Sequence, residues 1–381
     1  MPHPFKEFRS PKLGLGTMGH SFFAGTAGLL LFFVELQAAS PDAVPGDVVD
    51  RSLDALALAV SRLAALESAP GDLAEGAPGI LYAASRSGRA RAGDPRFTRL
   101  ADRAFDLVAA FHPEGHERAD VLTGVAGVVL ALLAYHRFTG REEALRLAIA
   151  HGDELLRRAE TPGPGRMAWR VSGRLLSGFA HGAGGIASTL ARLHERSGRE
   201  DLREAGTAAF RYELDLFDRR TGSWPDLRPR DEEGPAADGF MLGWCTGNPG
   251  VLLGLLDRPD AFPSGDVEEI VERGVEGIFE NLPRIRRDHL CCGKPSGVEV
   301  LGEIARRTGR DEILDRTLRG AVHLVERSKA AGGYYLDDLC PRSERYTFPP
   351  VGLFEGLAGI GLTWLRLSQE DAGPSPLAFT A

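Results

Sequence analysis

The sequence predicts an all-α protein, an α/α toroid with a double ring of seven inner and seven outer helices. Three observations favour this fold. A short glycine-containing pattern recurs seven times along the 381 residues. An apolar run follows each recurrence, and amphipathic, charged segments separate one recurrence from the next. Repeated units of this kind bury a continuous core by packing on their neighbours, and we expect them to close into a single domain over residues 1–381.

The recurring pattern consists of a glycine, two or three further residues, a second glycine and an apolar run. Its spacing of 46 to 65 residues suits two helices and their connections. Since glycine has no Cβ, the pattern is expected to allow close helix approach and a tight turn into each inner helix. The first glycines of the seven units are Gly25, Gly76, Gly124, Gly182, Gly247, Gly293 and Gly356.

The two kinds of helix differ in their side-chain pattern. Residues 128–135 and 186–193 are apolar nearly all round, which is typical of a buried inner helix. Residues 201–217 and 267–280 are amphipathic and charged, which predicts outer helices with one face in solvent.

The connections are less regular. The Pro- and Gly-bearing stretches 161–166 and 228–235 are predicted to be loops between units, and no interdomain linker stands out. The Pro-containing segment after Ser368 is expected to be a cap or a partly ordered tail.

The charge balance argues against several function classes. Asp and Glu number 53 against 45 Lys and Arg, for a net charge of −8, whereas a nucleic-acid-binding protein normally carries a basic stripe. The apolar stretch 22–34 is interrupted by Gly25, Thr26 and Gly28 and is too short to span a bilayer. No signal peptide is evident. We therefore expect a cytoplasmic protein that binds no nucleic acid and has no integral membrane segment.

Four cysteines in a chain of this length do not make a disulfide framework. They all lie in the second half, and the adjacent Cys291 and Cys292 are poorly placed to bridge each other. A reduced, intracellular setting is the simpler interpretation, with Cys340 a buried or surface thiol.

The positions just ahead of the first glycines hold the candidate functional residues. If the units are structurally equivalent, these positions form a ring at one mouth of the toroid. That ring would bring together side chains far apart in the sequence: Asp120, His181, Cys245, Cys291 and Cys292.

Three cysteines that meet in a reduced protein predict a zinc ion with three protein ligands. An open fourth position is typical of a catalytic zinc site. Zinc deprotonates a coordinating thiol, so a substrate thiol there would be a thiolate suited to attack on a carbon electrophile. Plainer interpretations stay open: cysteines that are simply buried, His181 in a structural role, and Asp120 as a helix N-cap.

Four motifs of the chain are Gly178-Phe-Ala-His-Gly182, Gly243-Trp-Cys-Thr-Gly-Asn-Pro-Gly250, Leu290-Cys-Cys-Gly293 and Phe354-Glu-Gly-Leu-Ala-Gly-Ile-Gly361. They resemble the motifs of the lanthionine synthetase C-like cyclases. The resemblance covers the chain from about Leu15 onward, and its details are similar to the C-terminal cyclase part of class II lanthipeptide synthetases. Many members have Cys-His-Gly where this chain has Cys291-Cys292-Gly293, and the three-cysteine form is a variant within the family.

The resemblance implies a function. A zinc ion on Cys245, Cys291 and Cys292 would activate a cysteine thiol of a dehydrated precursor peptide for addition to dehydroalanine or dehydrobutyrine. His181 would move the proton to the product carbon, and Asp120 would orient or assist it; the sequence leaves open which of the two transfers the proton. The dehydratase portion of class II synthetases is absent, which implies a separate dehydratase partner.

The chain also departs from the family pattern. Met241 stands where stand-alone cyclases have an arginine four residues before the first zinc cysteine, so no role for that arginine is carried over. Ser296 and Gly297 alter the turn after the second cysteine motif.

Two alternatives to a lanthipeptide cyclase remain. The first is an enzyme of the same family that adds a small thiol such as glutathione to electrophilic proteins. The second is a non-catalytic toroid that binds a precursor peptide and tethers a dehydratase. A toroidal glycosidase is disfavoured because no carboxylate pair stands out in the ring positions.

Overall fold

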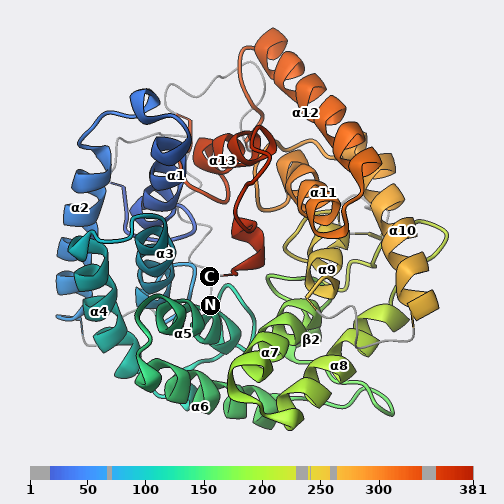
Figure 1. The fold of residues 1–381 in the computed structure, drawn as a ribbon. Helices are drawn as coiled ribbons and strands as arrows, with labels where there is room; N and C mark the ends of the chain where they lie inside the picture. The colour runs from blue at the N-terminus through green and yellow to red at the C-terminus, as the bar shows by residue number, and fades with distance from the viewer. Residues whose placement is uncertain are drawn as a thin grey trace.

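The computed structural model is a double ring of helices (Figure 1). Each inner helix is followed in the sequence by a helix of the outer ring, up to the last inner helix. Cys340 and Met241, for which expectations from the sequence are stated above, lie outside the described residues. So do residues 229–235 of the loop predicted at 228–235. The structure describes residues 18–66, 71–228, 239–240, 242–257, 264–336 and 349–380.

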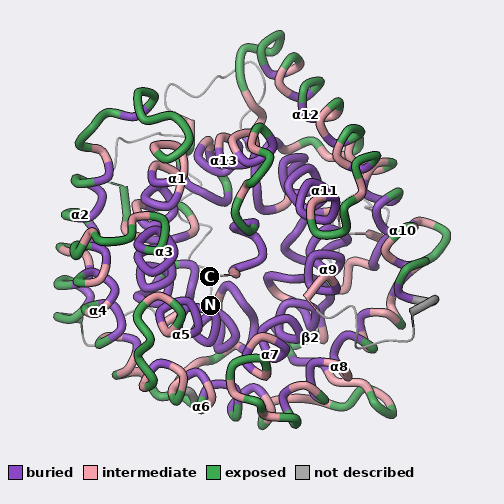
Figure 2. Tube along the Cα trace, in the orientation of Figure 1, coloured by how far each residue is buried: buried purple, intermediate pink, exposed green. Residues whose placement is uncertain are grey.

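Seven helices form the inner ring, as predicted from the seven glycine patterns (Figure 1). Figure 2 shows them buried along most of their length, whereas the outer helices expose their outward faces. The inner helices are α1 (Thr26–Ala39), α3 (Ala77–Ala90), α5 (Val125–Thr139), α7 (Ala183–Ser197), α9 (Asn248–Leu255), α11 (Lys294–Thr308) and α13 (Leu357–Leu367).

Six outer α-helices, not seven, are seen within the described ranges. After α13 the chain turns into the centre of the ring, where η6 (Pro376–Ala378) forms a short 3₁₀ turn (Figure 1). The α/α toroid is confirmed, but the segment after Ser368 takes the place of the expected last outer helix. The outer helices are α2 (Val48–Leu63), α4 (Pro95–Ala109), α6 (Glu142–Arg158), α8 (Glu200–Asp215), α10 (Ser264–Asn281) and α12 (Asp311–Ala331).

A small hairpin, β1 (Arg170–Val171) and β2 (Arg174–Leu175), lies between α6 and α7. Its two-residue turn has positive φ at Ser172 (52°) and Gly173 (80°), the backbone that a right-twisted hairpin requires. No helix in the part of the chain that the structure describes is long and apolar enough to cross a bilayer.

The two glycines of the recurring pattern have different structural roles. The first is the N-cap of an inner helix, in extended conformation. Three residues later, a Cβ on the second glycine would overlap the carbonyl oxygen six residues before it, as at Gly79 with Leu73. In the sixth unit Ser296, not Gly297, occupies this second position, and its Oγ bonds Gly293 O at 2.8 Å. The predicted alteration of this turn is therefore located at Ser296.

Replacing a second glycine by alanine should destabilise the fold. For Gly79→Ala we expect the free energy of unfolding to fall by about 1–3 kcal/mol, because the added methyl group meets Leu73 O and the side chain of Phe22. Gly320→Ala is the control: it lies mid-helix in α12 with nothing within 4 Å of the new Cβ, and should be neutral or stabilising by up to about 1 kcal/mol. Equal effects in urea titrations of both variants would contradict the steric role.

A circle of backbone hydrogen bonds joins the seven units. Each bond links neighbouring units at or beside the residue two before the first glycine, with N···O distances of 2.9 to 3.3 Å. The last bond, from Phe354 N to Phe23 O at 3.0 Å, closes the circle. We call these seven positions the hydrogen-bonded ring: Phe23, Ala74, Leu122, Ala180, Cys245, Cys291 and Phe354. The predicted ring of equivalent positions therefore exists, and its register follows from the glycines.

Candidate metal-binding and catalytic site

Three cysteine thiols meet on the hydrogen-bonded ring. Cys245 and Cys291 occupy the ring position in the fifth and sixth units, where Trp244 N donates to Cys291 O at 3.2 Å, and Cys292 follows directly. The three Sγ atoms lie within 4.8 Å of one another. Cys245 and Cys291 are each 7% exposed. The structure thus brings together the three residues that the sequence analysis selected as metal ligands.

The thiols perturb one another's ionisation. Hydrogen bonds from Cys291, and then from Cys292, hold the pKa of Cys245 well below its ordinary value. The hydrogen bond to Cys245 raises the pKa of Cys291 far above it, and raises that of Cys292 as well. One thiolate therefore forms readily, and its negative charge opposes ionisation of the other two thiols. A divalent cation would remove that opposition, so the donor set fits a bound metal.

Two arginines stand beside the thiols, and the sequence analysis missed both. Arg287 Nη1 lies 3.9 Å from Cys292 Sγ. The positive charge of Arg228, which is paired with Asp226 at 2.8 Å, contributes to lowering the pKa of Cys245. Both guanidinium groups favour negative charge on the sulfur atoms. Nothing in the motif spacing marks either residue.

His181 and Asp120 form a bonded pair. His181 Nδ1 and Asp120 Oδ2 are 2.8 Å apart, and Asp120 is fully buried. Asp120 also accepts hydrogen bonds from Thr123 N at 2.7 Å and Thr123 Oγ1 at 2.9 Å, so it braces the turn before α5 as well. With Nδ1 engaged, Nε2 is the nitrogen that His181, whose side chain is 28% exposed, can offer to a substrate.

The backbone places this pair next to the thiols. The amides of Ala180 and His181 both donate to Cys245 O, at 3.0 and 3.3 Å. On the other side, Val121 N, one residue after Asp120, donates to Ala180 O at 3.1 Å. Three consecutive units therefore carry Asp120, His181 and Cys245 at or beside neighbouring positions of the ring.

A buried carboxyl group, Glu213 of α8, holds the loop that carries His181. It accepts hydrogen bonds from Ser177 Oγ (2.6 Å), Gly178 N (3.1 Å) and Gly184 N (2.7 Å). Gly178 has φ +114°, and a Cβ there would overlap the backbone of Thr246, so only glycine fits this close approach. The signal in the sequence was a glutamate on the apolar face of an amphipathic helix, which the analysis did not single out.

Glu213 should make the stability of the fold depend on pH. Burial raises its pKa from 4.5 to about 7, although its three hydrogen bonds act in the opposite direction. Between these values the folded protein keeps a proton that the unfolded chain releases, so the free energy of unfolding falls as pH rises, by on the order of 3 kcal/mol. Glu213→Gln should lose this contribution.

Thermal melts at pH 4.5 and pH 7.5 measure the effect, with Glu204→Gln as the control because Glu204 is exposed on the same helix. The control should keep the pH dependence of the parent. If Glu213→Gln also keeps it, Glu213 does not hold the extra proton.

Comparison with known proteins places this geometry in a family. A family model described as lanthionine synthetase C-like protein matches residues 16–380. A nisin cyclase structure is similar with a TM-score of 0.69 at 19% identity, over 96% of this chain and 93% of that chain. This likeness confirms the α/α toroid fold.

Two further structures show weaker likeness. A protein from Listeria innocua has a TM-score of 0.48 at 14% identity, covering 80% of this chain and 83% of its own. A sugar epimerase from a ruminal bacterium has a TM-score of 0.47 at 14% identity, covering 77% and 87%. The family model, in contrast, extends over nearly every residue from the first described helix to the last. On that match, the chain belongs to the lanthionine synthetase C-like protein family.

Proposed function

We propose that the protein is a zinc-dependent lanthipeptide cyclase. It adds cysteine thiols of a dehydrated precursor peptide to dehydroalanine or dehydrobutyrine, and so forms lanthionine or methyllanthionine rings. Membership of the lanthionine synthetase C-like family supports a cyclase activity. The observation that carries the proposal is the gathering of three thiols within 4.8 Å at the hydrogen-bonded ring, where the amide of His181 donates to Cys245 O.

Zinc is the metal that this donor set suits. Thiolates are soft ligands that select zinc over the harder divalent cations, and Cys245, Cys291 and Cys292 would hold it with one ligand position left for the substrate. When bound, zinc lowers the pKa of a coordinating thiol, so that a nucleophilic thiolate exists at neutral pH. The guanidinium groups of Arg228 and Arg287 offset part of the negative charge of the thiolates.

The residues of the chain complete the reaction by moving one proton. Attack of the substrate sulfur on the β-carbon forms the C–S bond and breaks the C=C π bond, and the electron pair moves onto the α-carbon and its carbonyl. His181 can then donate a proton to the α-carbon from Nε2, because Nδ1 is bonded to Asp120. Asp120 holds the ring in orientation and stabilises its charged form. The proton released by the thiol replaces the one donated, so the peptide mass stays constant.

A dehydrated precursor, rather than the unmodified peptide, should be the substrate. Dehydration of Ser or Thr requires activation of the hydroxyl, and the 381-residue chain has no Gly-x-x-x-x-Gly-Lys-Ser/Thr loop or kinase signature to bind a nucleotide. We expect no change in an unmodified precursor even with ATP and magnesium. After separate dehydration of the same peptide, alkylatable cysteines should disappear at constant mass.

The same mass spectra test the alternatives. A gain of the mass of glutathione by the dehydrated substrate would favour addition of a small thiol. Loss of water from an unmodified precursor would contradict the need for a separate dehydratase. Purified protein that contains no zinc and leaves dehydrated peptides unchanged would favour a non-catalytic toroid.

A further inference from the structure

The segment after α13, residues 369–380, fills the centre of the inner ring. It turns inward from the end of α13 and reaches the axis of the toroid, where the C-terminal label lies (Figure 1). Pro376, Leu377 and Ala378 of η6 are buried, and Phe379 is 2% exposed. Residues 375–379 of the segment are therefore part of the core. We call it the central segment.

A second ring of side chains surrounds the central segment. Six of the seven residues that stand ten positions after a first glycine are charged, and the seventh is Ala134. Three ion pairs lie within this set: Arg86 with Glu35 (3.6 Å), Arg192 with Asp257 (2.6 Å), and Arg366 with Glu303 (3.0 Å). The charged ring consists of Glu35, Arg86, Arg192, Asp257, Glu303 and Arg366.

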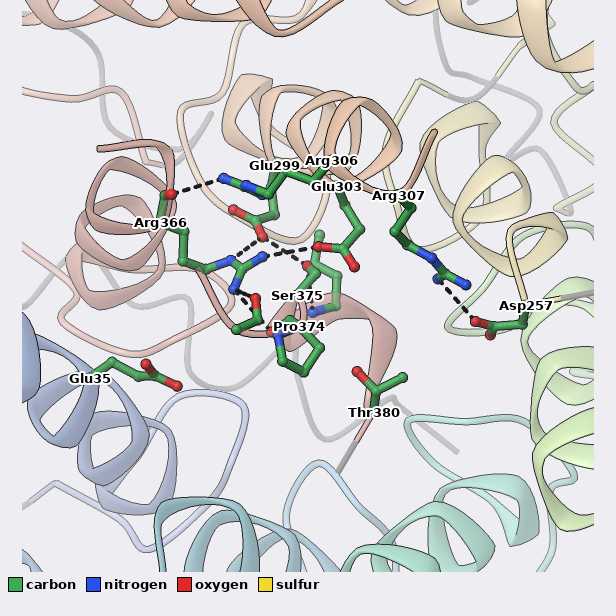
Figure 3. A network of polar contacts seen from close by, with 12 residues as sticks. Glu35, Asp257, Glu299, Glu303, Arg306, Arg307, Arg366, Pro374, Ser375 and Thr380 are labelled. Atoms are coloured by element: carbon green, nitrogen blue, oxygen red, sulfur yellow. Dashed lines mark hydrogen bonds and ion pairs between the residues drawn. The ribbon is translucent and has the colours of Figure 1, made fainter. Parts of the chain in front are cut away.

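The arginines of the charged ring bind the backbone of the central segment, as Figure 3 shows for Arg366. Arg86 donates to Pro374 O at 2.6 Å and to Ser375 O at 3.4 Å. Arg366 donates to Pro374 O at 3.0 Å and to Gly373 O.

Two further contacts come from other units. Arg192 donates to Ala378 O, and Ser375 Oγ bonds Glu299 Oε1 at 2.8 Å. Buried charges need partners, and these carbonyl groups supply them. The central segment and the charged ring therefore supply hydrogen-bond partners to each other.

Phe379 connects the central segment to the ring of cysteines. Its aromatic ring lies among five others, with centroid distances from 5.3 Å (Tyr82) to 6.4 Å (Phe354). One of the five is Trp244, at 6.0 Å, the residue before Cys245. Phe354 O accepts the hydrogen bond from Cys291 N at 2.9 Å. Phe379 thus packs against the residues that hold both buried cysteines.

The backbone of Phe379 is strained. Its φ of +51° is in the left-handed region, which a bulky side chain rarely adopts. Such a conformation persists only where the surroundings impose it. Here the charged ring fixes the carbonyl groups on one side, and the aromatic cluster receives the side chain on the other.

We propose that the central segment is an internal plug and that Phe379 is a positioning residue for the thiol cluster. This inference rests on the proposed function for its effect on catalysis. The plug closes the toroid on the side opposite the glycine turns, so a peptide reaches the thiols from the glycine-turn side alone. Through Trp244 and Phe354, Phe379 keeps Cys245 and Cys291 in register on the hydrogen-bonded ring.

Full-length Phe379→Ala tests the proposal by kinetics and by hydrogen exchange. We expect kcat for cyclisation to fall by about tenfold or more with KM within about twofold, since displaced groups impair the chemical step more than substrate binding. Backbone amides of Ala180, Trp244, Cys291 and Phe354 should exchange about tenfold faster, while those of α4 keep their rate. Phe379→Leu, which restores most of the volume, should recover both readouts.

Phe105→Ala is the matched control, because Phe105 is 1% exposed and stacks on Tyr135 at 4.7 Å, away from the ring. It should lower stability but leave kcat and the ring amides unchanged. If Phe379→Ala behaves like this control, or if Phe379→Leu recovers neither readout, the positioning role is wrong.

If Phe379→Ala fails to fold, Phe379→Leu is compared with the parent protein by the same two measurements. Slightly faster exchange that is confined to the ring amides supports the role. Exchange that is faster uniformly across the chain contradicts it. Hydrogen exchange needs neither zinc nor substrate. A parent protein without cyclase activity would overturn the proposed function, and the exchange pattern would still test the plug.

Discussion

Replacing Cys245 by alanine is expected to abolish stoichiometric zinc binding and cyclisation together. Cys245 is the thiol whose pKa is lowest of the three, because both other thiols donate to it. Its loss removes the first thiolate to form and leaves only Cys291 and Cys292 of the three protein ligands. We expect zinc affinity to fall by more than about 100-fold, since loss of an outer-shell partner alone costs up to that much.

Metal content per chain and competition with a chelator measure this effect. The parent protein should carry about one zinc ion, as expected for a single site with three cysteine ligands. Cys340→Ala is the control and should keep it. Full zinc retention by a Cys291→Ala, Cys292→Ala double variant would place the metal elsewhere and contradict the assignment.

The site could be predicted because the first glycine of each unit marks where its inner helix begins, and so fixes which residues of different units are equivalent. Two positions before a first glycine lies the hydrogen-bonded ring, so Cys245 and Cys291 had to become neighbours once the units closed. The same logic placed His181 beside them. For Asp120 the two interpretations were not exclusive: its carboxylate bonds both His181 and the turn before α5.

Other features could not be predicted because they depend on contacts between distant units. The central segment has no helical periodicity, and its burial requires arginines from three inner helices. Glu213 stands out on its helix as a buried charge, yet its partners lie 29 to 36 residues earlier in the sequence. Within the described residues no outer helix follows α13, since residues 369–380 are bound inside the ring instead of packing outside α13.

A common register also relates the two ends of the toroid. The hydrogen-bonded ring lies just before the inner helices, and the charged ring lies ten residues after each first glycine. The glycines fix both levels because each sets where its inner helix starts. A shift of one inner helix along its axis would therefore disturb the thiols and the plug at the same time, which is why close packing at the second glycine matters for function as well as stability.

His181→Ala is expected to retain zinc and fold but to slow cyclisation by roughly 10²–10⁴-fold, the usual contribution of a positioned acid–base group. The side chain is part-exposed, and its backbone amide, which bonds Cys245 O, is unchanged by the substitution. The thiols should therefore keep their arrangement while the proton donor is lost. Single-turnover cyclisation of a dehydrated peptide, with zinc measured on the same sample, separates the two effects.

Asp120→Asn is the companion variant, because an amide in place of the carboxylate can still bond Thr123 but no longer stabilises a charged imidazole at 2.8 Å. We expect it to lower the rate with zinc retained, and to add little to His181→Ala in the double variant, since the two residues act as one unit. Full additivity of the two losses would mean that Asp120 acts apart from His181. A His181→Ala protein that cyclises at the parent rate would leave this histidine with a structural role only.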